Sequence, residues 1–132
     1  MKQNTELTTQ QSLILDLLKK NNIPISSADI LLIMQKDNPK ANRMTIHRAL
    51  DKLIEIGLIH KIQLNNTYTI CQHPSDHNCQ LLVCIECGGK SEIHSHEMCH
   101  ILERLEKSNH FKFINPLEIN GICEKCQAKE TL

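Results

Sequence analysis

Apolar residues recur three or four positions apart, the spacing of an amphipathic helix, in three stretches of the first half of the chain. Each stretch follows a residue whose side chain can cap a helix: Thr8 or Thr9, Ser26 or Ser27, and Asn42. The apolar positions are Leu13, Ile14, Leu17 and Leu18, then Ile30, Leu31, Ile33 and Met34, then Ile46, Leu50, Leu53 and Ile54. The pattern predicts three short helices.

Two β-like runs, Leu58–Leu64 and Thr67–Ile70, follow Gly57, a natural stop for the third helix. Asn65-Asn66 separates them, and asparagine tolerates the left-handed conformation of a tight hairpin turn. Three helices and a hairpin, in this order, indicate a winged helix-turn-helix, whose third helix enters the major groove of DNA. A generic helical domain with a hairpin remains the alternative.

The second half of the chain mixes β-like runs with one helical stretch. Leu81–Cys84 and Lys90–Ile93 are predicted to pair as strands, and Ser95 to cap a helix. Phe111–Ile114 and Leu117–Ile119 are predicted as further strands. The predicted fold class is α+β: a winged-helix domain at 1–71, a polar hinge linker at 72–78 and a small α/β domain at 79–132.

Two pairs of cysteines, Cys84-x-x-Cys87 and Cys123-x-x-Cys126, have the spacing of zinc knuckles. A two-residue gap lets both thiolates bind one ion, and two knuckles complete a tetrahedral shell of sulfur. A single pair would also suit a thioredoxin-like redox motif, but the second copy and the lack of a surrounding βαβ pattern argue against it. The spacing predicts a structural zinc that closes the C-terminal domain.

The composition indicates the cellular compartment and the kinds of partner to expect. The 132 residues include seven cysteines and eight histidines, and an odd cysteine count among histidines favours metal binding in a reducing compartment over disulfides. Residues 1–10 lack the apolar core of a signal peptide, and no run approaches the roughly 18 apolar residues of a membrane span. We therefore expect a cytoplasmic protein without a membrane partner.

The net charge of zero counts against nucleic-acid binding, but residues 1–63 hold nine Lys or Arg against six acids, which leaves DNA binding open. In the third predicted helix, Thr45 and Arg48 point away from the apolar face, His47 flanks them and Arg43 lies at the start. Arginine can bind guanine O6 and N7 together. We take these four residues as DNA-binding candidates; a solvated arginine is the simpler alternative.

A second metal site is suggested by His60, Cys71, His77 and Glu92, which lie where the two domains must meet. If the hairpin pairs as predicted, His60 and Cys71 fall on neighbouring strands. One thiolate with two imidazoles and a carboxylate favours zinc over magnesium or manganese. The simpler alternative is that the histidines are solvated and the cysteine is a small core residue.

Four segments resemble the Fur superfamily of metal-dependent repressors. They are LTTQQSLILDLL at 7–18, MTIHRALDKLIEIGLIHKI at 44–62, LLVCIECGGKSEI at 81–93 and NGICEKC at 120–126. The chain looks most like the zinc uptake regulators, whose sensory ligands fall on His60, Cys71, His77 and Glu92. The resemblance implies a homodimer that binds palindromic double-stranded DNA operators, with one structural and one regulatory Zn²⁺ per chain.

Some positions depart from the superfamily pattern. A third site built from His, Asp, Glu and His in iron-type members falls on Asn78, Gln80, Cys99 and Asn115, so it looks dismantled, which favours zinc sensing. His47 stands where the superfamily usually has a recognition-helix Tyr, and an imidazole cannot reproduce a phenol's contact to DNA. Alternatives are an iron or peroxide sensor of the same superfamily, or a zinc-ribbon module that does not bind DNA. No enzyme or small-molecule substrate is expected, because four cysteines leave no open coordination position.

Overall fold

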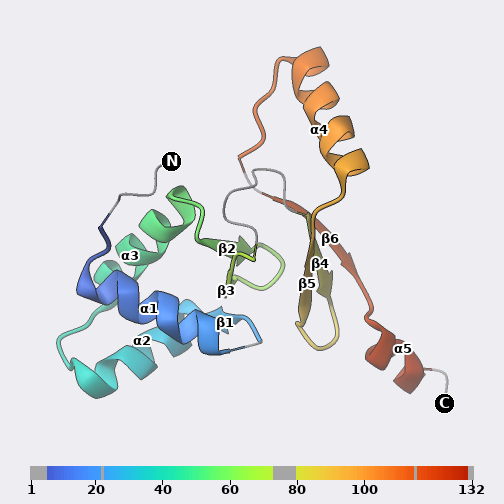
Figure 1. Ribbon diagram of the computed structural model, residues 1–132. Helices are drawn as coiled ribbons and strands as arrows, with labels where there is room; N and C mark the ends of the chain where they lie inside the picture. Colours follow the sequence, from blue (N-terminus) through green and yellow to red (C-terminus); the bar gives the residue numbers. More distant parts are fainter. Residues whose placement is uncertain (1–5, 22, 73–79, 115, 131–132) are drawn as a thin grey trace.

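The chain folds as an α+β protein with two three-stranded sheets (Figure 1), in a computed structural model that describes residues 6–21, 23–72, 80–114 and 116–130. The predicted fold class is confirmed. The element order is α1 (Thr9–Lys20), β1 (Ile25–Ser26), α2 (Ser27–Asp37), α3 (Arg43–Glu55), β2 (Ile59–Ile62), β3 (Thr67–Ile70), β4 (Gln80–Cys84), β5 (Lys90–Ile93), α4 (His96–Asn109), β6 (Leu117–Gly121) and α5 (Glu124–Glu130). We call α1 to β3 the N-terminal lobe and β4 to α5 the C-terminal lobe.

Side-chain caps begin the first three helices at predicted residues. Thr8, Ser26 and Asn42 each accept a hydrogen bond from a backbone N–H in the first turn of the helix that follows. The helices then bury one face around a core that includes Ile14, Leu15, Leu18, Ile30, Ile46, Leu50 and Leu53. The predicted stripes were wrong at Leu13, which is 46% exposed, and at Ile33, which is 38% exposed; on α1, Leu15 takes the buried position instead.

The hairpin follows the predicted pattern. Strands β2 and β3 pair antiparallel, with Ile59 opposite Ile70, and Asn66 in the turn has a left-handed φ of 55°. Gly57, with φ at 83°, ends the turn that follows α3. The sheet gains a third strand, β1, whose two residues were too few to give a sequence pattern.

The second sheet has the order β5-β4-β6, with β4–β5 antiparallel and β4–β6 parallel. The parallel pair makes Cys84 and Gly121 neighbours at one edge, so both cysteine pairs lie at that edge. The strand predicted at Phe111–Ile114 was wrong: the backbone N–H groups of Phe111 and Phe113 donate to Glu106, which turns this segment back onto α4. Helix α5 was not predicted.

The two faces of the second sheet have different surroundings. Leu81 lies opposite Glu92 on one side and Glu118 on the other, so these residues form a row across one face. On this face Leu81 and Val83 form a small buried core with Ile62 of the hairpin, which joins the two lobes. The other face exposes Leu82, Ile93 and Ile119.

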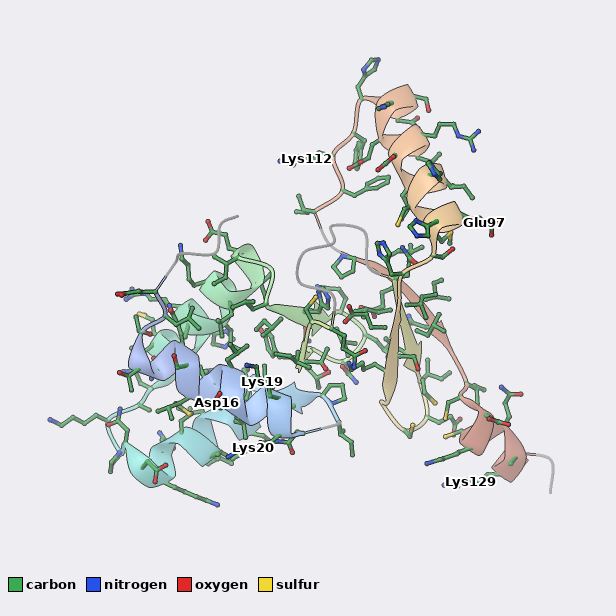
Figure 2. The ribbon with its side chains drawn as sticks, in the orientation of Figure 1. Asp16, Lys19, Lys20, Glu97, Lys112 and Lys129 are labelled. Carbon is green, nitrogen blue, oxygen red and sulfur yellow. The ribbon has the colours of Figure 1, made fainter. Side chains whose placement is uncertain are left out.

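Helix α4 extends away from the rest of the chain (Figure 1) and has no buried residue, although Ile101 and Leu105 are large apolar side chains. Figure 2 labels Glu97, an exposed residue in the first turn of this helix. Among the described residues, no helix is long and apolar enough to cross a bilayer.

Candidate metal centres

The four predicted zinc ligands, Cys84, Cys87, Cys123 and Cys126, come together at one edge of the second sheet. Their sulfur atoms all lie within 4.8 Å of one another. Zinc–sulfur bonds of about 2.3 Å imply about 3.8 Å between sulfurs of a tetrahedral site. The Cys87 and Cys123 sulfurs are 3.9 Å apart, which matches this spacing.

Backbone N–H groups surround the same sulfurs. Cys84 Sγ accepts from the N–H groups of Glu86, Cys87 and Cys123, and Cys87 Sγ accepts from Gly89. The bonds from Cys123 and Cys87 lower the pKa of the Cys84 thiol to about 6. The hydrogen bond with Cys123 raises the pKa of Cys126 to about 12. Crowded sulfurs resist carrying several negative charges, which a divalent cation would neutralise.

A second cluster, which we call the hinge site, joins the lobes. It consists of His60 on β2, Cys71 just after β3, and Glu92 on β5, and its ligand atoms all lie within 4.8 Å of one another. His60 Nε2 is 3.6 Å from Glu92 Oε1, and the Cys71 thiol donates to Glu92 Oε2 over 3.7 Å. A tetrahedral zinc implies about 3.4 Å for the nitrogen–oxygen pair and about 3.6 Å for the sulfur–oxygen pair.

The buried His60 nitrogen is a strong sign that this cluster serves a ligand. Among the described residues, the buried Nε2 atom has no hydrogen-bond partner. Burial lowers the pKa of His60 below its ordinary value of 6.5, with Lys90 adding to this effect and Glu92 opposing it. The neutral imidazole is therefore favoured, and it is the form that binds metal.

Three of the four residues predicted for the hinge site are thus brought together, and His77 lies outside the described residues. The Glu92 side chain is fully buried and also accepts the backbone N–H of Gln72, at 3.0 Å, which fixes the carboxylate in place. Such support around a ligand orients it for the metal.

Two positions predicted for the third site, Gln80 and Cys99, bond to each other. Gln80 is fully buried: its Oε1 accepts the N–H of Ser95, and its Nε2 donates to Cys99 Sγ. An amide and a thiol therefore occupy the two described positions predicted for the third site. The other two predicted positions, Asn78 and Asn115, lie outside the described residues.

The DNA-binding candidates lie in the first two turns of α3. Arg43, His47 and Arg48 are exposed, whereas Ile46 and Ala49 face the core. Thr45 is less available than the sequence suggested, because its hydroxyl donates to the Asn42 carbonyl and accepts from the Asn42 N–H. These two bonds belong to the helix cap.

One residue between the lobes was missed at the sequence level. The carboxylate of Glu118 accepts the backbone N–H groups of Gln63 and Leu64, at 2.7 and 2.9 Å. No local pattern could have found it, because its partners are more than 50 positions away and contribute only backbone atoms.

Known proteins similar to the chain include regulators of metal uptake. The Ferric uptake regulator family matches residues 2–119. The zinc uptake regulation protein of Escherichia coli K12 is 32% identical over 93% of the chain and 74% of its own length. The ferric uptake regulation protein of Bacillus subtilis 168 is 29% identical over 96% of the chain and 88% of its own length.

Two solved structures are also similar to the chain. A zinc uptake regulator complexed with zinc and DNA superposes with a TM-score of 0.86 at 29% identity, over 99% of this chain and 89% of that one. The crystal structure of holo XcZur has a TM-score of 0.82 at 27% identity, over 96% of this chain and 90% of that one.

Proposed function

The chain belongs to the ferric uptake regulator family, and on that basis we propose that it is a zinc-responsive transcriptional repressor, a homodimer that binds palindromic DNA operators when its hinge site holds zinc. The observation that carries the proposal is the meeting of His60, Cys71 and Glu92 between the lobes. Similarity to a regulator solved with zinc and DNA supports it.

The hinge site would couple zinc to DNA through the arrangement of the lobes. His60 and Cys71 come from the hairpin of the N-terminal lobe, and Glu92 comes from the sheet of the C-terminal lobe. His77 is the expected fourth ligand. Bound zinc supplies a cross-link between them. Because a ligand favours the state that it binds better, zinc would favour the arrangement that fits the operator. Coupling is reciprocal, so DNA should tighten zinc binding.

The four-cysteine site would hold a second, permanent zinc. All four ligands come from the C-terminal lobe, which has a buried core of very few residues. In a lobe this small, metal binding energy is folding energy. We therefore assign one structural and one regulatory zinc to each chain.

The C-terminal lobe would also form the dimer. Leu82, Ile93 and Ile119 expose one face of its sheet, and α4 exposes Ile101 and Leu105. Apolar surface of this extent needs a cover, and a second copy of the chain supplies one with the same composition. A homodimer then presents two α3 helices to half-sites about one DNA turn, or a multiple of it, apart.

On α3, Arg48, Arg43 and His47 would read or hold the DNA, because they are exposed near the N-terminal end of that helix. Thr45 would contribute mainly by holding the cap. The family consists of transcriptional regulators, so the chain is not an enzyme. Its place of action would be the cytoplasm, where the operator DNA lies.

The proposal is tested by selection from a random double-stranded DNA library with zinc-loaded protein. The expected result is a palindrome bound with zinc and released after mild chelation that leaves one zinc per chain. Iron(II) or manganese(II) in place of zinc separates a zinc sensor from an iron or peroxide sensor. Recovery of no palindrome would favour a zinc-ribbon module that does not bind DNA.

A further inference from the structure

The turn of the hairpin is attached to the C-terminal lobe at a point separate from both metal sites. Its centre is Glu118 on β6, whose carboxylate accepts the N–H groups of Gln63 and Leu64, just after β2 ends. A carboxylate that accepts two successive N–H groups forms two charge-assisted bonds, which are stronger than bonds between neutral groups. We call these two bonds the wing anchor.

Neighbouring contacts support the wing anchor. Ile62, which directly precedes Gln63, is fully buried against Leu81 and Val83 of the second sheet. The side-chain amide of Asn65 lies beside the first cysteine pair, since a Cβ atom on Gly88 would come 3.5 Å from Asn65 Nδ2. The turn therefore touches the C-terminal lobe at its start and at Asn65, and Glu118 supplies the polar contact.

The wing anchor and the hinge site are built on one row of the sheet. Glu92 and Glu118 lie on either side of Leu81, two strand spacings or about 10 Å apart. His60, which meets Glu92, and Gln63, which meets Glu118, are three residues apart on the hairpin, also about 10 Å in an extended chain. The hairpin thus lies across the sheet, and it meets Glu92 at one end of this contact and Glu118 at the other.

We propose that Glu118 is a positioning residue of the metal switch: it holds the hairpin turn on the C-terminal sheet whether or not the hinge site is filled. Zinc at the other end then sets the angle of a hairpin that is already attached, so less conformational freedom is lost on zinc binding. The consequence for zinc and DNA affinity rests on the proposed function, whereas the wing anchor itself does not.

The first experiment needs no DNA. In protein that keeps its four-cysteine zinc and has lost hinge zinc to mild chelation, hydrogen exchange is measured at the amides of Gln63 and Leu64. We expect both to exchange about tenfold faster or more in Glu118→Ala, because each loses a charge-assisted bond. Glu97→Ala, at an exposed glutamate on α4, is the control and should leave them unchanged. Equal exchange in Glu118→Ala and the native chain would overturn the proposal.

The second experiment measures hinge zinc affinity by competition with a chelator. Glu118→Ala should weaken it about tenfold while the zinc at the four cysteines and the oligomeric state stay unchanged, a split that general destabilisation would not give. Glu118→Asp keeps the charge but shortens the reach, so it should resemble Glu118→Ala. Glu118→Gln keeps one accepting oxygen and should lie between. Native zinc affinity in Glu118→Asp, with a full loss in Glu118→Gln, would show that charge rather than position matters and would refute the proposal.

The selected palindrome completes the test, with operator affinity of the zinc-loaded Glu118→Ala protein expected to fall in parallel with zinc affinity. The two hypotheses fail separately. If no palindrome is recovered, the repressor function fails while amide exchange still decides the wing anchor. If zinc-dependent DNA binding is present and Glu118→Ala leaves both affinities unchanged, Glu118 has no positioning role.

Discussion

The two candidate metal centres differ in where their predicted ligands come from. The four cysteines all belong to the C-terminal lobe, in two pairs that each span four residues, and backbone N–H groups already donate to the sulfurs of Cys84 and Cys87. The hinge site takes His60 and Cys71 from one lobe and Glu92 from the other. An ion at the first site stabilises one lobe, and an ion at the second site stabilises one arrangement of two lobes.

This difference decides which site can act as a switch. A ligand shifts an equilibrium only by its differential affinity for the two states. The four-cysteine site has the same ligands however the lobes are arranged, so its occupancy does not bias that arrangement. The hinge site loses the Glu92 carboxylate when the lobes take another arrangement, and its occupancy would therefore bias that arrangement.

The largest effect is expected from Cys84→Ser, which removes the sulfur that accepts three backbone N–H groups. Structural zinc contributes about 10–16 kcal/mol of apparent binding energy, so the C-terminal lobe should unfold or the dimer dissociate. Zinc content, circular dichroism and size-exclusion chromatography measure this. Cys99→Ser, outside both sites, is the matched control. A folded dimer that lacks this zinc would show that the four-cysteine site is not needed for folding.

Cys71→Ser should remove the switch and leave the fold. The buried thiol is replaced by a hydroxyl, a poorer zinc ligand, so the hinge site should lose zinc while the four cysteines keep one ion per chain. Operator binding should no longer respond to zinc, as measured by fluorescence anisotropy with the selected palindrome. A mutant that still responds to zinc would show that the hinge site has no sensory role.

Arg48→Ala should weaken operator binding without changing zinc binding at the hinge. Loss of an arginine that contacts guanine costs about 1–3 kcal/mol of operator binding, and hinge zinc affinity in the absence of DNA should be unchanged. Lys20→Ala, at an exposed residue on α1 that Figure 2 labels, is the control for loss of positive charge. If both variants bind the operator equally well, α3 does not read bases through Arg48.

The smallest effect concerns pH and the hinge without its metal. Burial lowers the pKa of His60 below 6.5 in the folded chain, so the unfolded chain binds more protons as pH falls through 6.5. The free energy of unfolding should therefore fall with pH from 6.5 down to the lowered pKa and then level off, by at most about 1.4 kcal/mol per pH unit.

Urea titrations of protein that keeps only its four-cysteine zinc measure this slope, and His60→Gln should reduce it. A slope that is the same in His60→Gln would mean that other groups cause the pH dependence. Protonation of His60 should weaken zinc binding at the hinge only below its lowered pKa in the folded chain, because the imidazole stays neutral above that pKa and only protonated imidazole cannot bind metal.

Local patterns predicted the parts of the molecule that depend on neighbouring residues. The knuckle spacing gave all four sulfurs of the first site, and the residues Thr8, Ser26 and Asn42 gave the helix starts. The hinge site needed the predicted pairing of the hairpin and the family resemblance. Three of its four residues do meet; His77 stays a prediction, as do the domain boundaries.

The sequence predictions failed where contacts with other residues determine the local structure. Phe111–Ile114 is rich in residues that favour strands, but Glu106 takes the N–H groups of Phe111 and Phe113, and the two aromatic rings pack on each other instead. Glu118 has no signal at all, because it binds the backbone of a distant turn. Contacts of this kind appear only once the lobes are placed together.

The buried Gln80 side chain has a mechanical consequence for α4. Gln80 bonds to the N–H of Ser95, the residue that caps α4, and to Cys99 in its first turn, while the rest of that helix stands clear of the sheet. These two bonds fix the N-terminal end of α4 against the sheet, whereas its later turns bury no residue. A second copy of the chain would meet α4 with its axial register already set and only its tilt left to adjust.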